Sequence, residues 1–376
     1  MNEIQCILDA FTLLRRESAQ VALATVMKVR GSAYRGPGAR LLITPDGRTF
    51  GSISAGCLER DLCERAQGVI ASGAPTVVTY DTTDMGENVW GLGLGCAGVI
   101  EVLLEPLDQD SPAGRLLAFL GERLARRDVG AVATVFRIGS GATAAVGSRL
   151  MLTREGPGFC SIANPQLAQA LTEEAQQALL EGRWRVKEYA VQGGTAEVLI
   201  EVVWPPLPLL IFGAGDDSVP LVRLAKEIGW HVTVVDSRPG FATSQRFPSA
   251  DAVVVVRPEE TAGRIPLDDR TVAVVMTHNY AHDVALIKML LPSPVRYLGV
   301  LGARSRTVAM LRALREEGLV VGEHDLAKVY SPIGMDIGAD TPEEIALAIL
   351  AEIKAVSTGR GAGFLRDRKA PIHDRV

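Results

Sequence analysis

The second half of the chain alternates short, continuously apolar runs with amphipathic stretches, and this alternation constrains the fold more than any other feature. The apolar runs, rich in Val, Ile and Leu, lie at residues 207–212, 231–236, 252–256, 272–277 and 295–301. Helical spacing of apolar residues lies between them, at residues 219–228, 281–291 and 305–317. Strands that are buried on both faces and separated by crossover helices form a parallel sheet. We therefore predict an α/β fold with a Rossmann-like, doubly wound domain over residues 209–357.

A proline-rich linker at residues 204–208 separates this domain from the first half. Its prolines, Pro205, Pro206 and Pro208, can continue neither a helix nor a central strand. Residues 1–203 predict a mixed α/β domain, in which no internal repeat is evident. The predicted helices lie at residues 4–14, 57–71 and 113–127, and the predicted strands at residues 21–29, 39–44, 49–54, 76–81, 99–104, 131–138 and 195–203. The charged residues 358–376 predict a loosely ordered tail.

Composition excludes several classes of protein. The chain has 376 residues, 47% hydrophobic and 22% charged, which is enough apolar surface for two cores and rules out a disordered or fibrous chain. A formal charge of −5 gives no general attraction to nucleic acid or anionic membranes. No apolar run approaches the roughly 18–20 residues of a membrane span, and the N-terminal pattern is helical rather than that of a signal peptide. The five cysteines are scattered without a CxxC pair, so we expect a reducing cytoplasm and neither disulfides nor a zinc ribbon.

A glycine turn follows the first predicted strand of the second half. Gly213-Ala214-Gly215 precedes a helix, and Asp236 ends the next strand, as in dinucleotide-binding domains. Asp216 and Asp217 stand at the helix start, and we expect Asp217 to be the N-cap. Asp217 would then occupy the backbone N–H groups that usually bind a phosphate, and both carboxylates would repel the anion. This argues against tight NAD binding. An NAD(P)-dependent oxidoreductase remains the alternative hypothesis.

A cysteine follows a turn of small residues in the first half. In Gly51-Ser52-Ile53-Ser54-Ala55-Gly56-Cys57-Leu58-Glu59, the turn brings Cys57 to a helix start, where free N–H groups favour a thiolate. A thiolate there suits nucleophilic attack, persulfide carriage or ligation of a soft metal. The alternative is a buried structural cysteine, with Glu59 as an ordinary acid of the first helical turn.

A second cysteine lies in a glycine-rich segment, Trp90-Gly91-Leu92-Gly93-Leu94-Gly95-Cys96-Ala97-Gly98. Such a loop can wrap a polar ligand through its backbone N–H groups. A tight bend between strands is the alternative. We expect Cys57 and Cys96 to lie near each other and to face the sheet crevice of the second half.

Two further segments carry charged or titratable groups. The loop from Arg30 to Arg40 includes Ser32 and Arg35 and could capture a phosphate, although a solvated loop would look the same. His278 and His282, next to Asp283, could bind a metal, but no third ligand is evident from spacing, so loop and helix-cap roles are preferred. His278 follows a predicted strand, which directs it toward the ligand crevice of a parallel sheet.

Together these segments resemble the XdhC/CoxI family, the accessory proteins of xanthine dehydrogenase and related molybdenum hydroxylases. The matching stretches are residues 30–39, 51–59, 93–98, 211–215, 234–239, 246–248, 276–278, 297–304 and 332–346. The chain departs from the family pattern at a few positions, namely Ala55, Ala97, Asp216 and Ala303. These departures bear on contacts with a ligand rather than on membership of the family.

The resemblance implies an N-terminal XdhC/CoxI domain, a C-terminal Rossmann domain, and a protein that binds molybdenum cofactor, supports its sulfuration and inserts it into an apo-hydroxylase. The cofactor is molybdopterin or a dinucleotide form. Cys57 and Cys96 would handle molybdenum or sulfur. The residues expected to contact the cofactor are Arg30, Ser32, Arg35, Gly56, Glu59, Gly93, Gly95, Gly213, Gly215, Asp236, Arg238, His278 and Arg304. The implied partners are a hydroxylase of the xanthine or CO dehydrogenase type, a cysteine desulfurase and a second copy of the chain.

Overall fold

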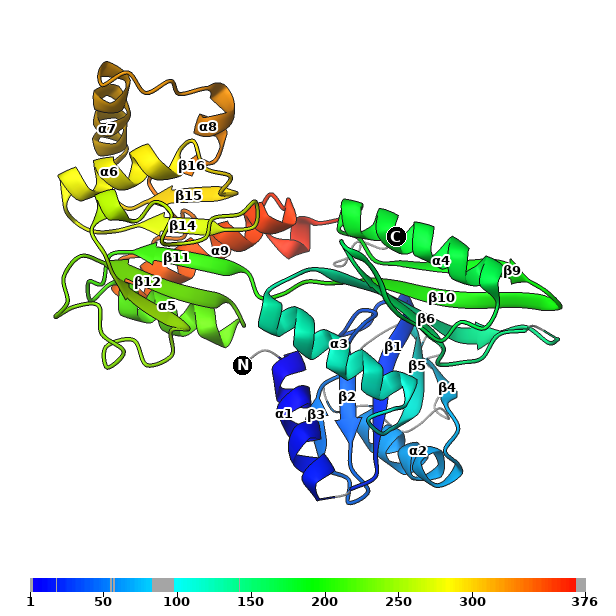
Figure 1. The fold of residues 1–376 in the computed structure, drawn as a ribbon. Helices are drawn as coiled ribbons and strands as arrows, with labels where there is room; N and C mark the ends of the chain where they lie inside the picture. The colour runs from blue at the N-terminus through cyan, green and yellow to red at the C-terminus, as the bar shows by residue number, and fades with distance from the viewer. Residues whose placement is uncertain are drawn as a thin grey trace. The chain divides into compact units, whose positions relative to one another are not determined.

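The protein divides into two compact units, residues 3–205 and residues 206–367, in a computed structural model (Figure 1). The structure describes residues 3–17, 19–54, 56, 58–82, 98–141 and 143–369. Within these ranges no helix is long and apolar enough to cross a membrane.

The second unit contains the predicted parallel sheet. Its strand order is β13-β12-β11-β14-β15-β16, and every neighbouring pair is parallel. The strands are β11 (Pro208–Phe212), β12 (His231–Asp236), β13 (Ala252–Val255), β14 (Val272–Val275), β15 (Tyr297–Val300) and β16 (Val329–Tyr330). The helices are α5 (Ser218–Glu227), α6 (Tyr280–Leu290), α7 (Arg304–Glu316), α8 (Glu323–Ala327) and α9 (Pro342–Thr358). The predicted α/β, Rossmann-like fold is confirmed.

Helices cover both faces of this sheet because side chains alternate along each strand. Leu209 and Ile211 of β11 pack on the side of α5 and α9, while Leu210 and Phe212 pack on the side of α6 and α7. The start of α9 is well specified: Thr341 accepts a hydrogen bond from the backbone N–H of Glu344, whose carboxylate accepts from the N–H of Thr341 in return.

The first unit contains two antiparallel sheets. The first has the order β3-β2-β1-β5-β4 and the second the order β8-β7-β6-β10-β9. The first sheet comprises β1 (Val21–Gly31), β2 (Arg40–Ile43), β3 (Thr49–Gly51), β4 (Thr76–Asp81) and β5 (Gly98–Leu107). The second comprises β6 (Gly130–Ile138), β7 (Arg149–Thr153), β8 (Gly156–Cys160), β9 (Arg185–Val191) and β10 (Gly194–Val203). The helices are α1 (Glu3–Arg16), α2 (Glu59–Ser72), α3 (Pro112–Arg126) and α4 (Pro165–Glu181).

The two sheets are copies of one another, which corrects the expectation that the chain has no internal repeat. The first repeat runs from α1 to β5 and the second from α3 to β10, with the same order of elements and strands. Thr25 pairs with Leu103 and Thr134 pairs with Leu199 in the same register, and a bulge follows at the same place in both pairs of strands. Thr25 and Thr134 are 109 positions apart, and so are the helix-ending glycines Gly73 and Gly182.

Buried ion pairs connect the repeats reciprocally. Arg149 of the second repeat binds Glu105 of the first through both guanidinium Nη atoms, and Arg40 of the first binds Glu201 of the second. All four side chains are nearly inaccessible to solvent. Each arginine also donates to the carbonyl of a glycine two residues earlier. The repeats are therefore related as the two halves of a two-fold symmetric dimer are.

Apolar residues complete this arrangement in layers. The small cluster of Met27, Leu103, Phe136 and Leu199 joins the inner faces of the two sheets, and its members are matched in pairs by the repeat. The outer faces carry α2 and α4 respectively (Figure 1). Helices α1 and α3 pack into a further shared core.

Candidate functional site

Three segments of the first repeat break the internal symmetry. Residues 30–37 carry two arginines, whereas their counterparts, residues 139–146, carry none. Residues 82–97 join β4 to β5, whereas only residues 192–193 join β9 to β10. Helix α2 begins at a later position of the first repeat than helix α4 does of the second repeat. These departures coincide with the three ligand loops predicted from the sequence.

The strand ends that flank two of these segments meet at one end of the first sheet. Because β1 and β5 are antiparallel, Gly31 at the end of β1 pairs with Gly98 at the beginning of β5. Asp81, the last residue of β4, pairs with Val99 at this end, whereas Gly51, the last residue of β3, lies through Leu41 level with Ala24 of β1. The turn after β3 is instead joined to the arginine loop by Glu3, which binds both Arg35 and the backbone N–H of Ser52. A Cβ at Gly98 would lie 2.4 Å from the carbonyl oxygen of Ser32, so the strand ends approach too closely for any other residue.

The arginine loop is only partly free to bind a ligand. Arg30 is 62% exposed, and its guanidinium lies 3.9 Å from Glu101. Arg35 instead binds Glu3 at the start of α1, and the same carboxylate accepts the backbone N–H of Ser52. Ser32 is exposed. Arg30 therefore remains the candidate phosphate ligand of this loop, while Arg35 joins the loop to α1.

Two cations that the sequence reasoning missed lie beside Arg30. Arg137 of the second repeat binds Glu101, and its repeat counterpart Lys28 binds Glu197 with an Nζ–Oε1 distance of 2.6 Å. The recurrence of a basic residue three positions after Thr25 and after Thr134 is the signal that would have found them. Three cations and two carboxylates thus leave a net positive charge near this end of the sheet.

Glu59 holds the turn that precedes α2. Its carboxylate accepts from the backbone N–H groups of Ile53, Ser54 and Leu58, and from the Ser54 hydroxyl. Gly56, within the turn, has a φ of 97°, which favours glycine. In the second repeat Asn164 caps α4 in the ordinary way by accepting the N–H of Leu167. Glu59 was expected to contact the cofactor, but its carboxylate instead holds the turn together.

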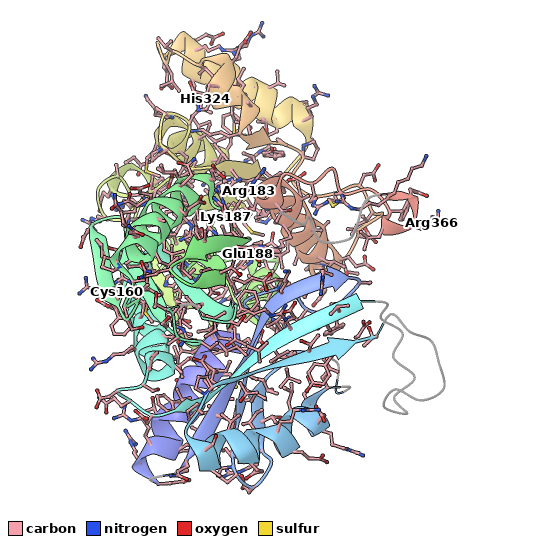
Figure 2. All side chains as sticks on the ribbon, turned by 90° about the vertical axis from the view of Figure 1, so that its right-hand side faces the viewer. Cys160, Arg183, Lys187, Glu188, His324 and Arg366 are labelled. Atoms are coloured by element: carbon pink, nitrogen blue, oxygen red, sulfur yellow. The ribbon has the colours of Figure 1, made fainter. Side chains whose placement is uncertain are left out.

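Cys57 and Cys96, the two cysteines expected to handle molybdenum or sulfur, lie outside the described residues, as do Gly93 and Gly95. The expected proximity of Cys57 and Cys96 therefore stays a prediction. Among the described cysteines, Cys160 is exposed on β8 of the second repeat (Figure 2). Burial, with the charges of Glu59 and Glu64, raises the pKa of the Cys63 thiol, which disfavours a nucleophilic role.

The glycine turn of the second unit is closed by its own acids. Gly213 has a φ of 122°, and a Cβ there would lie 2.4 Å from the carbonyl oxygen of Met276. Asp217 is the N-cap residue of α5, as expected, but its side chain accepts no hydrogen bond from the N–H groups of the helix. Its carboxylate instead lies against Gly215, where an added Cβ would be 2.6 Å from Asp217 Oδ1, and it binds His278 Nε2 at 2.7 Å. The position where a pyrophosphate approaches a Rossmann turn therefore carries a carboxylate.

Asp236 ends β12 as predicted, but its oxygens are already occupied. It accepts the backbone N–H groups of Ala214 and Arg238 and binds the Arg238 guanidinium through both oxygens. Burial alone would raise the pKa of Asp236, but the hydrogen bonds from Arg238 and the two backbone groups outweigh it and hold the pKa below its ordinary value. The carboxylate stays ionised and positions Arg238.

The histidine segment forms a helix cap rather than a cluster of metal ligands. Asn279 caps α6 through the N–H of His282, and buried Asp283 binds Thr277 and Arg306. In the described part of the chain no group of three His, Cys, Asp or Glu side chains is arranged to hold a metal ion. Arg304 is exposed at the start of α7.

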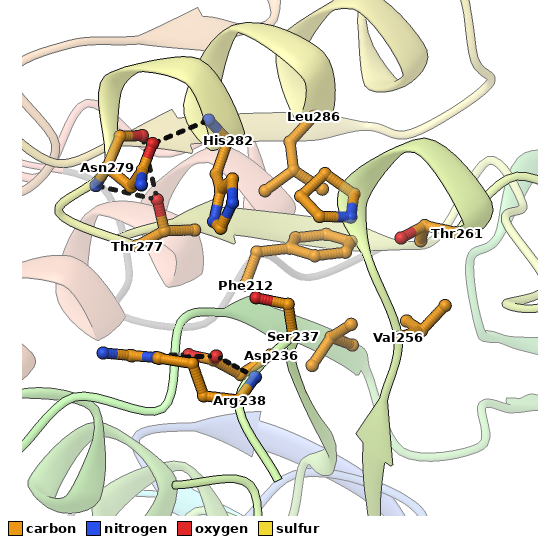
Figure 3. A pocket seen from close by; sticks show the side chains of 12 residues that line it. Phe212, Asp236, Ser237, Arg238, Val256, Thr261, Thr277, Asn279, His282 and Leu286 are labelled. Atoms are coloured by element: carbon orange, nitrogen blue, oxygen red, sulfur yellow. Dashed lines mark hydrogen bonds and ion pairs between the residues drawn. The ribbon is translucent and has the colours of Figure 1, made fainter.

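A pocket opens at the carboxyl ends of β11, β12, β13 and β14. Figure 3 shows the ring of Phe212 at its centre, with Ser237 on one side and Leu286 on the other. Asp236 and Arg238 border it, and His282 lies at its rim. Ligands of open parallel sheets bind at this place.

A duplicated antiparallel unit followed by a Rossmann unit defines a two-domain α/β protein. The XdhC and CoxI family model matches residues 14–81, within the first repeat, and the XdhC Rossmann domain model matches residues 209–353. A Bacillus subtilis (strain 168) protein, described as a probable subunit of xanthine dehydrogenase, is 31% identical over 356 residues, which are 94% of this chain and 97% of that protein. The chain belongs to the XdhC and CoxI family.

Two further similarities agree with this membership. The molybdenum cofactor insertion chaperone PaoD of Escherichia coli (strain K12) is 22% identical over 334 residues, covering 89% of this chain and 82% of PaoD. The crystal structure of a xanthine dehydrogenase from Bacillus halodurans superimposes with a TM-score of 0.76 at 28% identity, covering 96% of this chain and 97% of the other.

Proposed function

We propose that this protein is a maturation chaperone that binds molybdenum cofactor, supports its sulfuration and inserts it into a hydroxylase of the xanthine dehydrogenase type. One observation carries the proposal: the three predicted ligand loops are the segments where the first repeat departs from the second, and the strand ends that flank two of them meet at one end of the first sheet. Similarity to a protein called a molybdenum cofactor insertion chaperone supports it.

The residues at this end of the sheet fit a phosphorylated pterin as cargo. The exposed Arg30 guanidinium supplies donors for a phosphate, and the neighbouring cations keep the local charge positive. Cys57 and Cys96 would supply thiolates for molybdenum or for sulfur received from a cysteine desulfurase.

The closed glycine turn argues against the alternative of an NAD(P)-dependent oxidoreductase. Asp217 over Gly215 and the nearby Asp216 would repel a pyrophosphate. As a chaperone the protein would work in the cytoplasm, where its client hydroxylase and the desulfurase reside, and it would act as a homodimer.

Activation of an apo-hydroxylase tests the proposal. Protein purified from cells that synthesise the cofactor should restore activity to a cofactor-free xanthine dehydrogenase, because it carries the missing group. Protein from cells that lack cofactor synthesis is the control and should restore none. Failure of the loaded protein to activate a hydroxylase that free cofactor does activate would contradict the proposal.

A further inference from the structure

A row of alternating charges connects the arginine loop of the first repeat with the second repeat. The row consists of Arg30, Glu101, Arg137, Glu197 and Lys28. Arg137 Nη2 donates a hydrogen bond to Glu101 Oε2, and Arg137 Nη1 lies 3.4 Å from Glu197 Oε2. Lys28 binds the other oxygen of Glu197. Arg30 stands at the end of the row, with its Nη2 3.9 Å from Glu101 Oε1. Glu101 thus lies between two arginines.

The carboxylate of Glu101 needs a cation beside it. Its side chain is only 1% exposed, and Oε1 is buried with no hydrogen-bond partner among the described residues. An ionised carboxylate in such surroundings is strongly destabilised when its cation is removed. Arg137 of the second repeat supplies this cation through the hydrogen bond to Oε2.

Arg30 is near this carboxylate without being bound to it. The separation of 3.9 Å is longer than a hydrogen bond, and the Arg30 side chain is 62% exposed. Its guanidinium N–H groups are therefore available to an anion. If Arg137 were absent, the unpaired charge and the unfilled Oε1 of Glu101 would attract Arg30, and the same N–H groups would be used inside the protein.

The second repeat shows the same acid and cation without a third charge. Lys28 and Glu101 are paired across their strands in the register that pairs Arg137 with Glu197. Lys28 is thus the counterpart of Arg137, and it binds Glu197 as Arg137 binds Glu101. The position equivalent to Arg30 is Gly139, 109 residues later. The acid is therefore satisfied by one cation from the other repeat, and Arg30 is an addition to this arrangement.

We propose that Arg137 is a positioning residue for the cargo: by pairing with Glu101, it keeps the Arg30 guanidinium free to bind the phosphate. Arg137 acts through Glu101 and Arg30 rather than by touching the ligand. The inference rests on the proposed function and deepens it, because it gives the second repeat a part in holding the cargo. The second repeat is then more than a structural support for the first.

The reaction of Arg30 with phenylglyoxal tests this proposal in full-length protein from cells that lack cofactor synthesis. The reagent modifies free guanidinium groups faster than those engaged in buried ion pairs, and mass spectrometry of the peptide that contains Arg30 gives the rate at this residue. Arg137→Met should slow the modification of Arg30 by about tenfold or more, because Glu101 would then hold Arg30. Unfolding would make the reaction faster, so a slower rate cannot result from lost structure.

Further variants separate positioning from direct contact with the ligand. Arg137→Met combined with Glu101→Gln should restore the wild-type rate, since the neutral amide has no charge to attract Arg30. Arg137→Lys should also keep the wild-type rate, because Lys28 shows that lysine is sufficient at this place in the repeat. Arg126→Met removes an exposed arginine of the same repeat, which pairs with Glu122, and is the matched control with an unchanged rate.

The pterin content of the same variants connects Arg30 with the cargo. Arg137→Met, made in cells that synthesise the cofactor, should retain about tenfold less pterin than the wild type, and the double variant should regain it. If Arg137→Met does not fold, Arg137→Gln replaces it and should show the same two losses.

Three results would overturn the inference. The first is an Arg30 rate in the folded variant that equals or exceeds the wild-type rate. The second is a slow rate that persists in the double variant, and the third is undiminished pterin in a variant whose Arg30 has become slow. A wild type without pterin would instead refute the proposed function, and the Arg30 rates would still test the pairing.

Discussion

Replacing Arg149 with methionine should destabilise the first unit by about 3–5 kcal/mol, the largest effect that we expect from a single substitution. Glu105, which is 5% exposed, would lose its bidentate partner and remain as an unpaired charge between the two repeats. Methionine fills much of the arginine volume, so the loss reports the missing charge rather than a cavity. Urea unfolding of the full-length protein measures the difference in the free energy of unfolding.

Two further variants separate the ion pair from other causes. Arg149→Met combined with Glu105→Leu should recover most of the lost stability, because a buried pair replaced by apolar side chains of similar size is often neutral. Arg115→Ala, which breaks a pair with the exposed Asp110 on the same unit, should cost less than about 1 kcal/mol. An Arg149→Met variant as stable as the wild type would contradict the reciprocal connection of the repeats.

Replacing Cys57 with alanine should lower the retained cofactor, and the activation of the client hydroxylase, by about tenfold or more. The expected reason is loss of the thiolate that holds molybdenum or passes on sulfur, and a tenfold change corresponds to about 1.4 kcal/mol. Pterin content and client activity are the two measurements. Both should fall while the unfolding transition stays unchanged, since alanine removes only one sulfur atom.

Cys160→Ala is the matched control for this substitution. Cys160 is exposed in the second repeat, at the position that corresponds to Gly51 in the first. Cofactor content should stay at the wild-type level, because the second repeat lacks the three loops. Equal content in the wild type and in Cys57→Ala would remove Cys57 from the mechanism.

The repeat explains how the first unit carries one candidate site instead of two. Both copies keep the residues that join them, including the buried arginines and the glutamates that bind them. Only the first copy has the arginine loop, the turn held by Glu59 and the long connection between β4 and β5. The second copy therefore acts as a structural partner, and it adds Arg137 beside the loops of the first.

The sequence predicts the second unit far better than the first. Buried parallel strands are continuous apolar runs, so β11 to β15 can be recognised to within a few residues, and the capping box of Thr341 locates the start of α9. In the first unit the sequence does not reveal β7, β8, β9 and α4. Short antiparallel strands with mixed exposure, such as β8 and β9, give no clear periodicity.

The repeat is hard to recognise in the sequence for a related reason. Its two copies agree in the strand centres and in the ion-pair residues, whereas the most conspicuous motifs, such as the Cys57 turn and the arginine loop, are the segments that differ. The side-chain partner of Asp217 could not be assigned from the sequence either. A residue just before a helix can cap it or bind another side chain, and only the tertiary position of His278 decides between these.

The pterin and molybdenum content of the purified protein tests the central claim most directly. The full-length chain would be purified from cells that synthesise the cofactor, and its pterin would be oxidised, released and measured by fluorescence beside molybdenum analysis of the same sample. We expect about one pterin per chain, because only the first repeat carries the three loops, and we expect a large loss in Cys57→Ala but not in Cys160→Ala. A folded protein that contains neither pterin nor molybdenum under these conditions would contradict the claim that it carries the cofactor.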